Sequence, residues 1–205
     1  CLMASIASPY GLKAVNELGG LPYSGSTRQF LIDPAGYAVN IFNGSVVAIN
    51  TAGYLEVVTT NGDNTTPFPA GTIGVFVGCS YVNAQGQVIY AQYYPAGTTG
   101  VATAYVIDDD RAVFQVQSVG TVAQAAIGAN VYLNAVQSTS TGSTTTGNST
   151  SAIVIGSSAA ATSGLAFRVV GFVDMYGFSS VGDAYTDVLV KFNPAAHSYS
   201  NPAGI

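Results

Sequence analysis

Residues able to carry out catalysis are few in this sequence and lie far apart along it. The single histidine, His197, is near the end of the chain in a stretch of Pro, Ala and Ser. Acid–base and nucleophilic catalysis need titratable groups held together in one pocket. The carboxylates Glu17, Glu56, Asp174 and Asp183 show no spacing that would pair them, and no Gly-x-Ser-x-Gly turn or phosphate-binding glycine loop occurs. We therefore expect no catalytic residues and no enzyme, with His197 as a solvated or interface-packed tail residue.

The sequence also offers little for binding a metal or a cofactor. Two cysteines and one histidine do not supply the ligand spacing of a zinc site. The one acidic cluster, Asp108-Asp109-Asp110 followed by Arg111, carries the oxygen ligands that Ca²⁺ prefers. However, alternate residues of an extended chain point apart, and no EF-hand-type glycine loop follows. We interpret the cluster as a solvated turn that Arg111 partly neutralises, with cation binding as the alternative, and expect no metal and no cofactor.

The two cysteines differ in their surroundings. Cys79 lies in an apolar run whose alternation places Val75, Val77, Cys79 and Tyr81 on one face, which predicts a buried, unreactive thiol. Cys1 and Leu2 precede Met3, which we interpret as the natural start. A lipidated Cys1 and a Cys1–Cys79 disulfide are the alternatives.

Composition excludes several classes of protein. Of the 205 residues, 7% are charged and 48% hydrophobic, and the formal net charge is −5. A chain with five Lys and Arg has no cationic surface for nucleic acid or anionic lipid. Intrinsic disorder needs low hydrophobicity with high net charge, and a disulfide scaffold needs more cysteines. No run approaches the roughly 18 apolar residues of a membrane span. We expect neither nucleic acid nor membrane as a partner.

A surface this poor in charge points to a component of an assembly. Soluble monomers use charge to remain apart, whereas a chain covered by partners needs less of it. The 13 tyrosines fit this interpretation, because Tyr suits both water and interfaces. A small secreted β-protein with a Ser, Thr and Asn surface is the alternative.

Strand signals dominate from residue 28 onward. Short runs rich in Val, Ile, Tyr and Phe alternate with turn residues, which predicts an all-β fold, a β-sandwich or barrel (jelly-roll-like), with little helix. The predicted strands are 28–33, 38–42, 45–49, 54–59, 73–81, 88–94, 102–107, 112–116, 130–133, 152–155, 166–173 and 186–192. Asn43-Gly44 and Gln85-Gly86 predict tight hairpins. Only 122–127 resembles a helical turn, with Gly128 as its stop.

The chain divides into an arm, one domain and a tail. Residues 1–26 contain turn residues and spaced apolar anchors, which predicts an extended N-terminal arm laid along its own or a neighbour's surface. Residues 27–192 form a single β-domain, in which the Ser, Thr, Gly and Asn stretch 138–151 is an exposed loop. Residues 193–205 form a C-terminal tail. The residues predicted to bind a partner are anchors of the arm: Tyr10, Leu12, Leu18, Leu21 and Tyr23.

Several segments, taken in order along the chain, resemble the capsid cement proteins of tailed bacteriophages, also called decoration or head-stabilising proteins. They are ASPYGLK (7–13), LGGLPYSG (18–25), YVIDDDRAVFQVQ (105–117), STTTGNS (143–149) and LAFRVVGFV (165–173). The family usually has a proline after the first two aspartates, where this chain has Asp110, so the local turn geometry differs.

The resemblance implies a structural virion protein without catalytic residues. Such a protein binds the outer surface of a phage head and cements neighbouring major capsid subunits. The partners implied are the major capsid protein and further copies of the chain in a homo-oligomer, on the capsid surface of a virion assembled in the bacterial host cytoplasm. A receptor- or carbohydrate-binding surface β-protein of a virion or cell is the alternative function. The major capsid protein itself fits less well, since that role usually needs a long helix and more charge.

Overall fold

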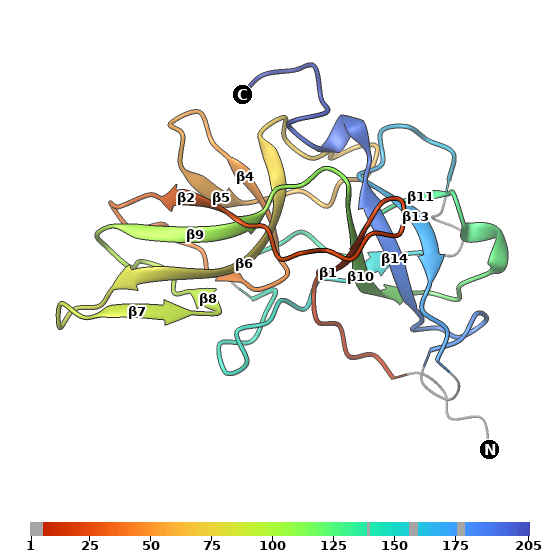
Figure 1. The fold of residues 1–205 in the computed structure, drawn as a ribbon, viewed down its shortest axis with the longest axis horizontal. Coiled ribbons are helices and arrows are strands. Elements are labelled where there is room, and N and C mark those ends of the chain that lie inside the picture. The colour runs from red at the N-terminus through yellow and green to blue at the C-terminus, as the bar shows by residue number, and fades with distance from the viewer. Residues whose placement is uncertain (1–5, 139, 156–159, 176–178) are drawn as a thin grey trace.

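A computed structural model describes residues 6–138, 140–155, 160–175 and 179–205 of the chain, and its regular structure is almost entirely β-strand (Figure 1). The all-β prediction with little helix is confirmed. The described residues include two short 3₁₀ helices, η1 (Gln124–Ala126) and η3 (Pro194–Ala196), and η1 lies inside the predicted helical turn. The strands are β1 (Lys13–Glu17), β2 (Arg28–Ile32), β3 (Ile41–Phe42), β4 (Val46–Ile49), β5 (Leu55–Val57), β6 (Thr72–Val82), β7 (Val88–Ala91), β8 (Tyr93–Tyr94), β9 (Ala102–Ile107), β10 (Ala112–Val119), β11 (Asn130–Leu133), β12 (Ile153–Val154), β13 (Phe167–Phe172) and β14 (Asp187–Phe192).

The strands form two six-stranded sheets, and each sheet closes on itself. Sheet I has the order β1-β10-β12-β11-β13-β14, and a β10–β14 pairing joins its ends into a ring of five strands with β1 outside. Sheet II has the order β4-β5-β2-β9-β6-β7, and a β4–β6 pairing closes a second ring with β7 outside. Closure selects the barrel among the predicted architectures, because it pairs strand edges that a sandwich leaves open. A further pair, β3 with β8, forms a separate two-stranded sheet whose Ile41 and Tyr94 side chains pack against sheet II.

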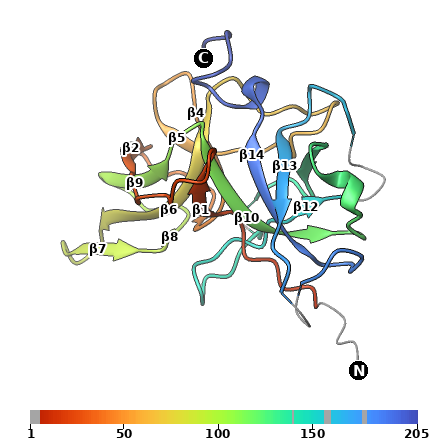
Figure 2. The same ribbon diagram turned by 45° about the vertical axis from the view of Figure 1, so that its right-hand side comes forward.

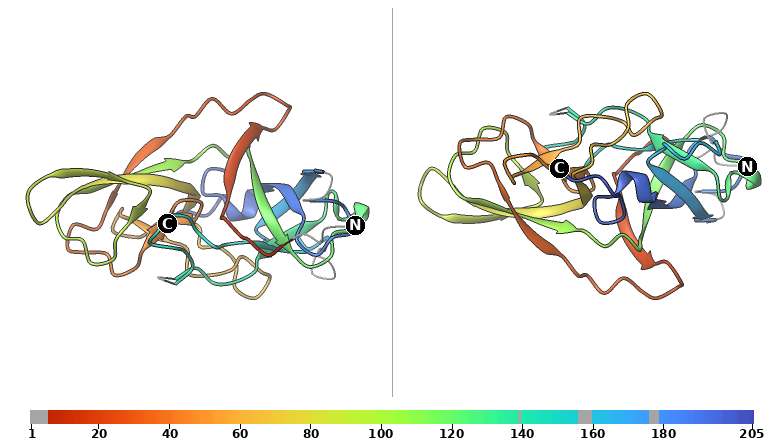
Figure 3. Two further views of the ribbon diagram at one scale, coloured as in Figure 1. Left: turned by 90° about the horizontal axis from the view of Figure 1, so that it is seen from below. Right: turned by 90° about the horizontal axis from the view of Figure 1, so that it is seen from above.

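The two rings lie side by side along the long axis of the molecule and share a hydrophobic core (Figure 3). This large core takes Phe114, Phe167 and Val190 from sheet I, and Val46 and Val75 from sheet II. All five side chains are fully buried. Because each such side chain contributes roughly 1.5–3 kcal/mol on burial, the contact between the sheets is a main source of stability.

A small core fills the ring of sheet II, and strand β6 contributes to both cores. The register of β6 against β9 shifts between Phe76 and Gly78. Val75 consequently faces the large core, whereas Phe76 and Cys79 face the small one. Cys79 is buried as predicted, but it does not share a face with Val75. The β-bulge causes the difference, since an extra residue reverses the alternation of side chains.

One of the two predicted hairpins forms and the other does not. Gln85-Gly86 lies in the loop that joins β6 to β7, and Val82 is paired with Val88 across it. Strands β3 and β4, on either side of Asn43-Gly44, pair instead with β8 and with β5 and β6. Gly44 has a positive φ of 88°, and a Cβ on it would lie 2.9 Å from the Leu12 nitrogen. The glycine therefore permits a close crossing of two chain segments, not a hairpin.

The prediction that residues 138–151 form an exposed loop is wrong for much of its described part. Ser149 and Ser151 are buried, and Gly142 lies against the ring of Phe42. Asn43 donates its backbone N–H to the Gly147 carbonyl oxygen and accepts the N–H of Ser149. Small side chains let this segment lie close to neighbouring backbone, so low complexity here reflects tight packing. Among its described residues, positions 140, 144–146 and 150 are exposed.

Candidate functional site

The N-terminal segment, residues 6–26, runs along the outside of sheet I, where β1 pairs antiparallel with β10 (Figure 2). The side-chain amide of Gln117 in β10 binds the start of the segment through both its oxygen and its nitrogen. Its Oε1 accepts the backbone N–H of Ser8 at 2.8 Å, and its Nε2 donates to the Ile6 carbonyl at 3.1 Å. Strand β1 is not predictable from the local sequence, because a five-residue strand with Lys13 and Glu17 at its ends shows little alternation.

Two of the predicted partner-binding residues lie against the chain's own body. Leu12 is 1% exposed and belongs to the large core, so the expectation that it contacts a partner is wrong. Tyr10 is half-buried, and Lys13 Nζ lies 4.6 Å from the centroid of its ring. Burial, together with the nearby charge of Asp187, raises the pKa of Tyr10 above its ordinary value. These residues anchor the segment.

The leucine tip, residues 18–21, presents apolar side chains to solvent. Leu18 is 40% exposed and Leu21 61% exposed. The turn is held by Glu17, whose backbone N–H donates to the Leu21 carbonyl at 2.7 Å and whose carbonyl accepts the Gly20 N–H at 3.1 Å. Tyr23, just after the tip, is half-buried against the large core. Of the five predicted residues, Leu18 and Leu21 are the most exposed, Tyr10 and Tyr23 are half-buried, and Leu12 is buried.

The acidic turn, residues 108–111, lies beside the leucine tip and joins β9 of sheet II to β10 of sheet I. Leu18 donates its backbone N–H to the Arg111 carbonyl, and Arg111 Nη2 donates to the Leu18 carbonyl at 3.3 Å. The ion pair of the turn is made by Arg28, whose Nε lies 2.9 Å from Asp108 Oδ2. Asp110 and Arg111 are exposed, as the prediction of a solvated turn requires. The prediction that Arg111 partly neutralises the turn is wrong for Asp108, because Arg28 is its ion-pair partner and the Asp108 side chain is only 12% exposed.

The C-terminal tail fastens onto the same acidic turn. Tyr199 donates its hydroxyl to Asp108 Oδ2 at 2.8 Å, and Ser200 donates to Asp110 Oδ2 at 2.8 Å. Burial, followed by the hydrogen bond to Asp108, raises the pKa of Tyr199 to about 12. Three distant parts of the sequence thus meet at this turn: the N-terminal segment, the link between the sheets and the tail.

The prediction that His197 is solvated or lies at an interface is wrong. The side chain is 1% exposed, and its ring packs edge-on against Phe192 and Tyr199 at centroid distances of 5.5 and 5.3 Å. Its Nδ1 accepts the backbone N–H of Tyr199 at 3.3 Å. Burial lowers the pKa of His197, and the neighbouring carboxylates of the acidic turn oppose that shift. The residue acts as a packing element that holds the tail.

No group of His, Cys, Asp and Glu side chains among the described residues has a geometry that would hold a metal ion. In the acidic turn the carboxylates instead accept hydrogen bonds from Tyr199, Ser200 and the Arg111 backbone. The expectations that involve Cys1, its lipidation and its disulfide, lie outside the described residues.

A second exposed apolar surface, which the sequence analysis missed, covers the outer face of sheet II. Its residues lie on neighbouring strands or next to them, and each is at least 41% exposed: Leu31, Val82, Val88, Tyr90 and Val101. The sequence does carry a signal for it, because no charged residue occurs between Asp63 and Asp108. That uncharged run contains strands β6 to β9.

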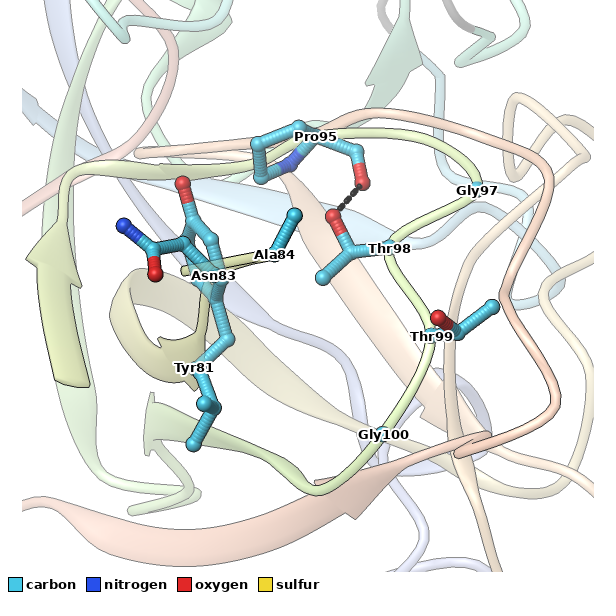
Figure 4. Close-up of a pocket in the computed structure, with 9 residues that line it drawn as sticks. Tyr81, Asn83, Ala84, Pro95, Gly97, Thr98, Thr99 and Gly100 are labelled. Carbon is cyan, nitrogen blue, oxygen red and sulfur yellow. Dashed lines mark hydrogen bonds between the residues drawn. The ribbon is translucent and has the colours of Figure 1, made fainter. Parts of the chain in front are cut away.

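A groove of about 510 Å³ lies between the β6–β7 hairpin and the loop after β8 (Figure 4). Its lining is uncharged: Tyr81, Val82, Asn83, Ala84, Pro95, Gly97, Thr98, Thr99 and Gly100. Thr98 donates its hydroxyl to the Pro95 carbonyl, and Asn83 Oδ1 accepts the N–H groups of Gln85 and Gln87. These two side chains are already engaged within the protein, which leaves the Tyr81 ring and the Thr99 hydroxyl for contact with a ligand.

Comparison of the chain with protein-family models, with curated proteins and with solved structures gave no match. In the described part of the chain, no helix has the length and apolar character that crossing a membrane requires.

Proposed function

We propose that this protein is a structural component of a bacteriophage virion that binds the outer surface of the head and cements neighbouring major capsid subunits. The proposal starts from the resemblance of five segments, spread over most of the chain, to capsid cement proteins. The observation that carries it is the leucine tip, where Leu18 and Leu21 are exposed on a turn that the chain's own hydrogen bonds fix.

A fixed apolar turn is suited to docking in a lattice. Binding costs less when the contacting segment is already ordered, and Gln117, Leu12 and the β1–β10 ladder order this one. A repeated shell also allows many modest contacts to act together. This role requires no catalytic group, metal or cofactor.

The leucine tip can be tested by the double substitution Leu18→Ser with Leu21→Ser. Two exposed apolar contacts are lost while the core remains intact, so we expect the number of copies per particle to fall at least about tenfold, as measured by quantitative gel electrophoresis of purified particles. The matched control is Ile127→Ser with Val136→Ser, which changes two other exposed apolar residues. Equal occupancy by wild type and the tip variant would contradict the proposal.

The groove supports a second candidate function, binding of a carbohydrate receptor. An uncharged lining with an aromatic ring is typical of sugar contacts, and Tyr81 supplies that ring. Binding of the isolated protein to a glycan array, lost in Tyr81→Ala and accompanied by no affinity for heads, would favour this function over capsid binding.

A further inference from the structure

Strand β7 has an open edge. It is the last strand of sheet II and, within the described residues, its ladder partner is β6 alone. The strand lies at the margin of the molecule, where the ribbon views show no other segment beyond it (Figures 1 and 2).

The backbone groups on this edge can be assigned from the ladder. Asn83 donates its N–H to the Gln87 carbonyl, which makes them a hydrogen-bonded pair. Such pairs alternate in an antiparallel ladder, so Ile89 and Ala91 bond to β6. Val88 and Tyr90 therefore direct their N–H and C=O groups away from β6. The side chains of the same two residues are 61% and 77% exposed.

The edge lacks the features that normally prevent strands from pairing. Natural edge strands are protected by charged residues, proline or a covering segment. Strand β1, the outer strand of sheet I, has Lys13 and Glu17, and its own turn covers it through the Asn16–Pro22 bridge. No described segment pairs with the outer edge of β7, and its flanking residues Gln87 and Gln92 are neutral.

We propose that β7 pairs antiparallel with β7 of a second copy of this chain, about a two-fold axis through Ile89. In this register Val88 of each copy lies opposite Tyr90 of the other, and the outward N–H and C=O groups of both residues form four backbone hydrogen bonds. Two copies of β7 are complementary, because the outward N–H and C=O groups of Val88 and Tyr90 in one copy meet those of Tyr90 and Val88 in the other. Neither copy carries a charge on β7 that would repel the same charge on its partner.

The side chains also favour a second copy of this chain as the partner of β7. Val82 is paired with Val88 on the outer face of the hairpin, and Tyr90 lies two residues further along the strand on the same face. Pairing of two copies joins these residues into one apolar strip across the axis, which removes exposed Val and Tyr surface from water. The inference concerns the isolated protein and does not depend on a role in a virion.

The test uses purified full-length protein in sedimentation velocity and size-exclusion experiments over about 1–200 µM. We expect wild type to shift reversibly from one to two copies as its concentration rises. Two variants, Val88→Lys with Tyr90→Lys and Val88→Glu with Tyr90→Glu, should each remain monomeric, because like charges then face one another across the axis. An equimolar mixture of the two should form a heterodimer, since Lys then faces Glu.

Two controls separate edge pairing from general effects. Ile127→Lys with Val136→Lys adds the same charge at exposed sites away from β7 and should dimerise as wild type does. Tyr90→Pro removes an outward N–H that β6 does not use, so it should abolish dimers while circular dichroism shows a folded chain. Wild type that is monomeric at 200 µM overturns the proposal. So does failure of the Lys and Glu variants to associate when mixed, or a strand of another protein occupying β7 while the chain alone does not dimerise.

Discussion

At the scale of single residues, the groups that could do chemistry serve packing. Burial raises the pKa of Cys79 to about 12, so the thiol is protonated at neutral pH, and its Sγ donates to the Tyr93 carbonyl at 3.5 Å. A thiolate is the reactive form of cysteine, and this environment suppresses it. His197 is likewise enclosed between two aromatic rings.

His197 makes stability depend on pH. Its pKa in the folded protein lies below the value of about 6.5 expected for the unfolded chain, so the unfolded state binds the proton more readily. The stabilisation is present above that value and is lost as the pH falls through it. We expect the urea midpoint of wild type to fall between pH 7.5 and 5.5 by more than that of His197→Phe, which keeps an aromatic ring without the titration. Parallel pH profiles of the two proteins would contradict this.

At the scale of elements, the N-terminal segment is part of the folded body. The chain segments that contain Gly11 and Gly44 cross at close range, and the Leu12 N–H donates to the Gly44 carbonyl at 3.0 Å. The Leu12 side chain lies in the large core. Removal of residues 6–26 would therefore damage the β-domain itself, so this segment is not an arm separate from that domain. Substitution at single positions is the way to separate docking from folding.

Leu12→Ala should destabilise the protein by about 2–5 kcal/mol, because it leaves a cavity in a core that cannot fully collapse. The matched control is Leu18→Ala, the same chemical change at a position 40% exposed, where a loss within about 0.5 kcal/mol is expected. Chemical denaturation monitored by circular dichroism measures both values. Similar losses for the two variants would mean that the segment is not anchored through Leu12.

At the scale of the whole molecule, charge is distributed unevenly. The acidic turn, with Arg28 and the end of β1, gathers charged side chains where the termini meet the junction between the sheets. Strands β6 to β9 of sheet II carry none. The molecule thus presents a polar junction and, on β6 to β9, a group of uncharged strands, which are surfaces for chemically different contacts.

The shared core predicts that both sheets unfold together. Although the chain is longer than most two-state domains, its large core joins residues of both rings. We expect a single thermal transition with equal calorimetric and van't Hoff enthalpies. Ile73→Val in the small core and Ile153→Val in the large core should each lower that one midpoint, at a cost of about 0.5–1.5 kcal/mol. Two separate transitions, or an effect of each variant on a different one, would show independent sheets.

Local sequence determined the strands well. Alternating Val, Ile, Phe and Tyr between turn residues located β9 and β11 at their observed ends, and Gln85-Gly86 located the β6–β7 hairpin. These features depend on neighbouring residues only, because side-chain alternation and positive φ are local properties. Composition also indicated a chain made for contact with partners, which remains a prediction.

Tertiary structure alone decided which strands pair and which residues lie inside. Closure of two rings, the parallel β10–β12 pair and the crossing at Gly44 join segments far apart in sequence. The same contacts bury His197, Leu12 and Ser149. A two-residue period tells which side chains share a face of a strand, but not whether another part of the chain will cover that face. In this protein both faces of several strands are covered, so burial follows from long-range packing.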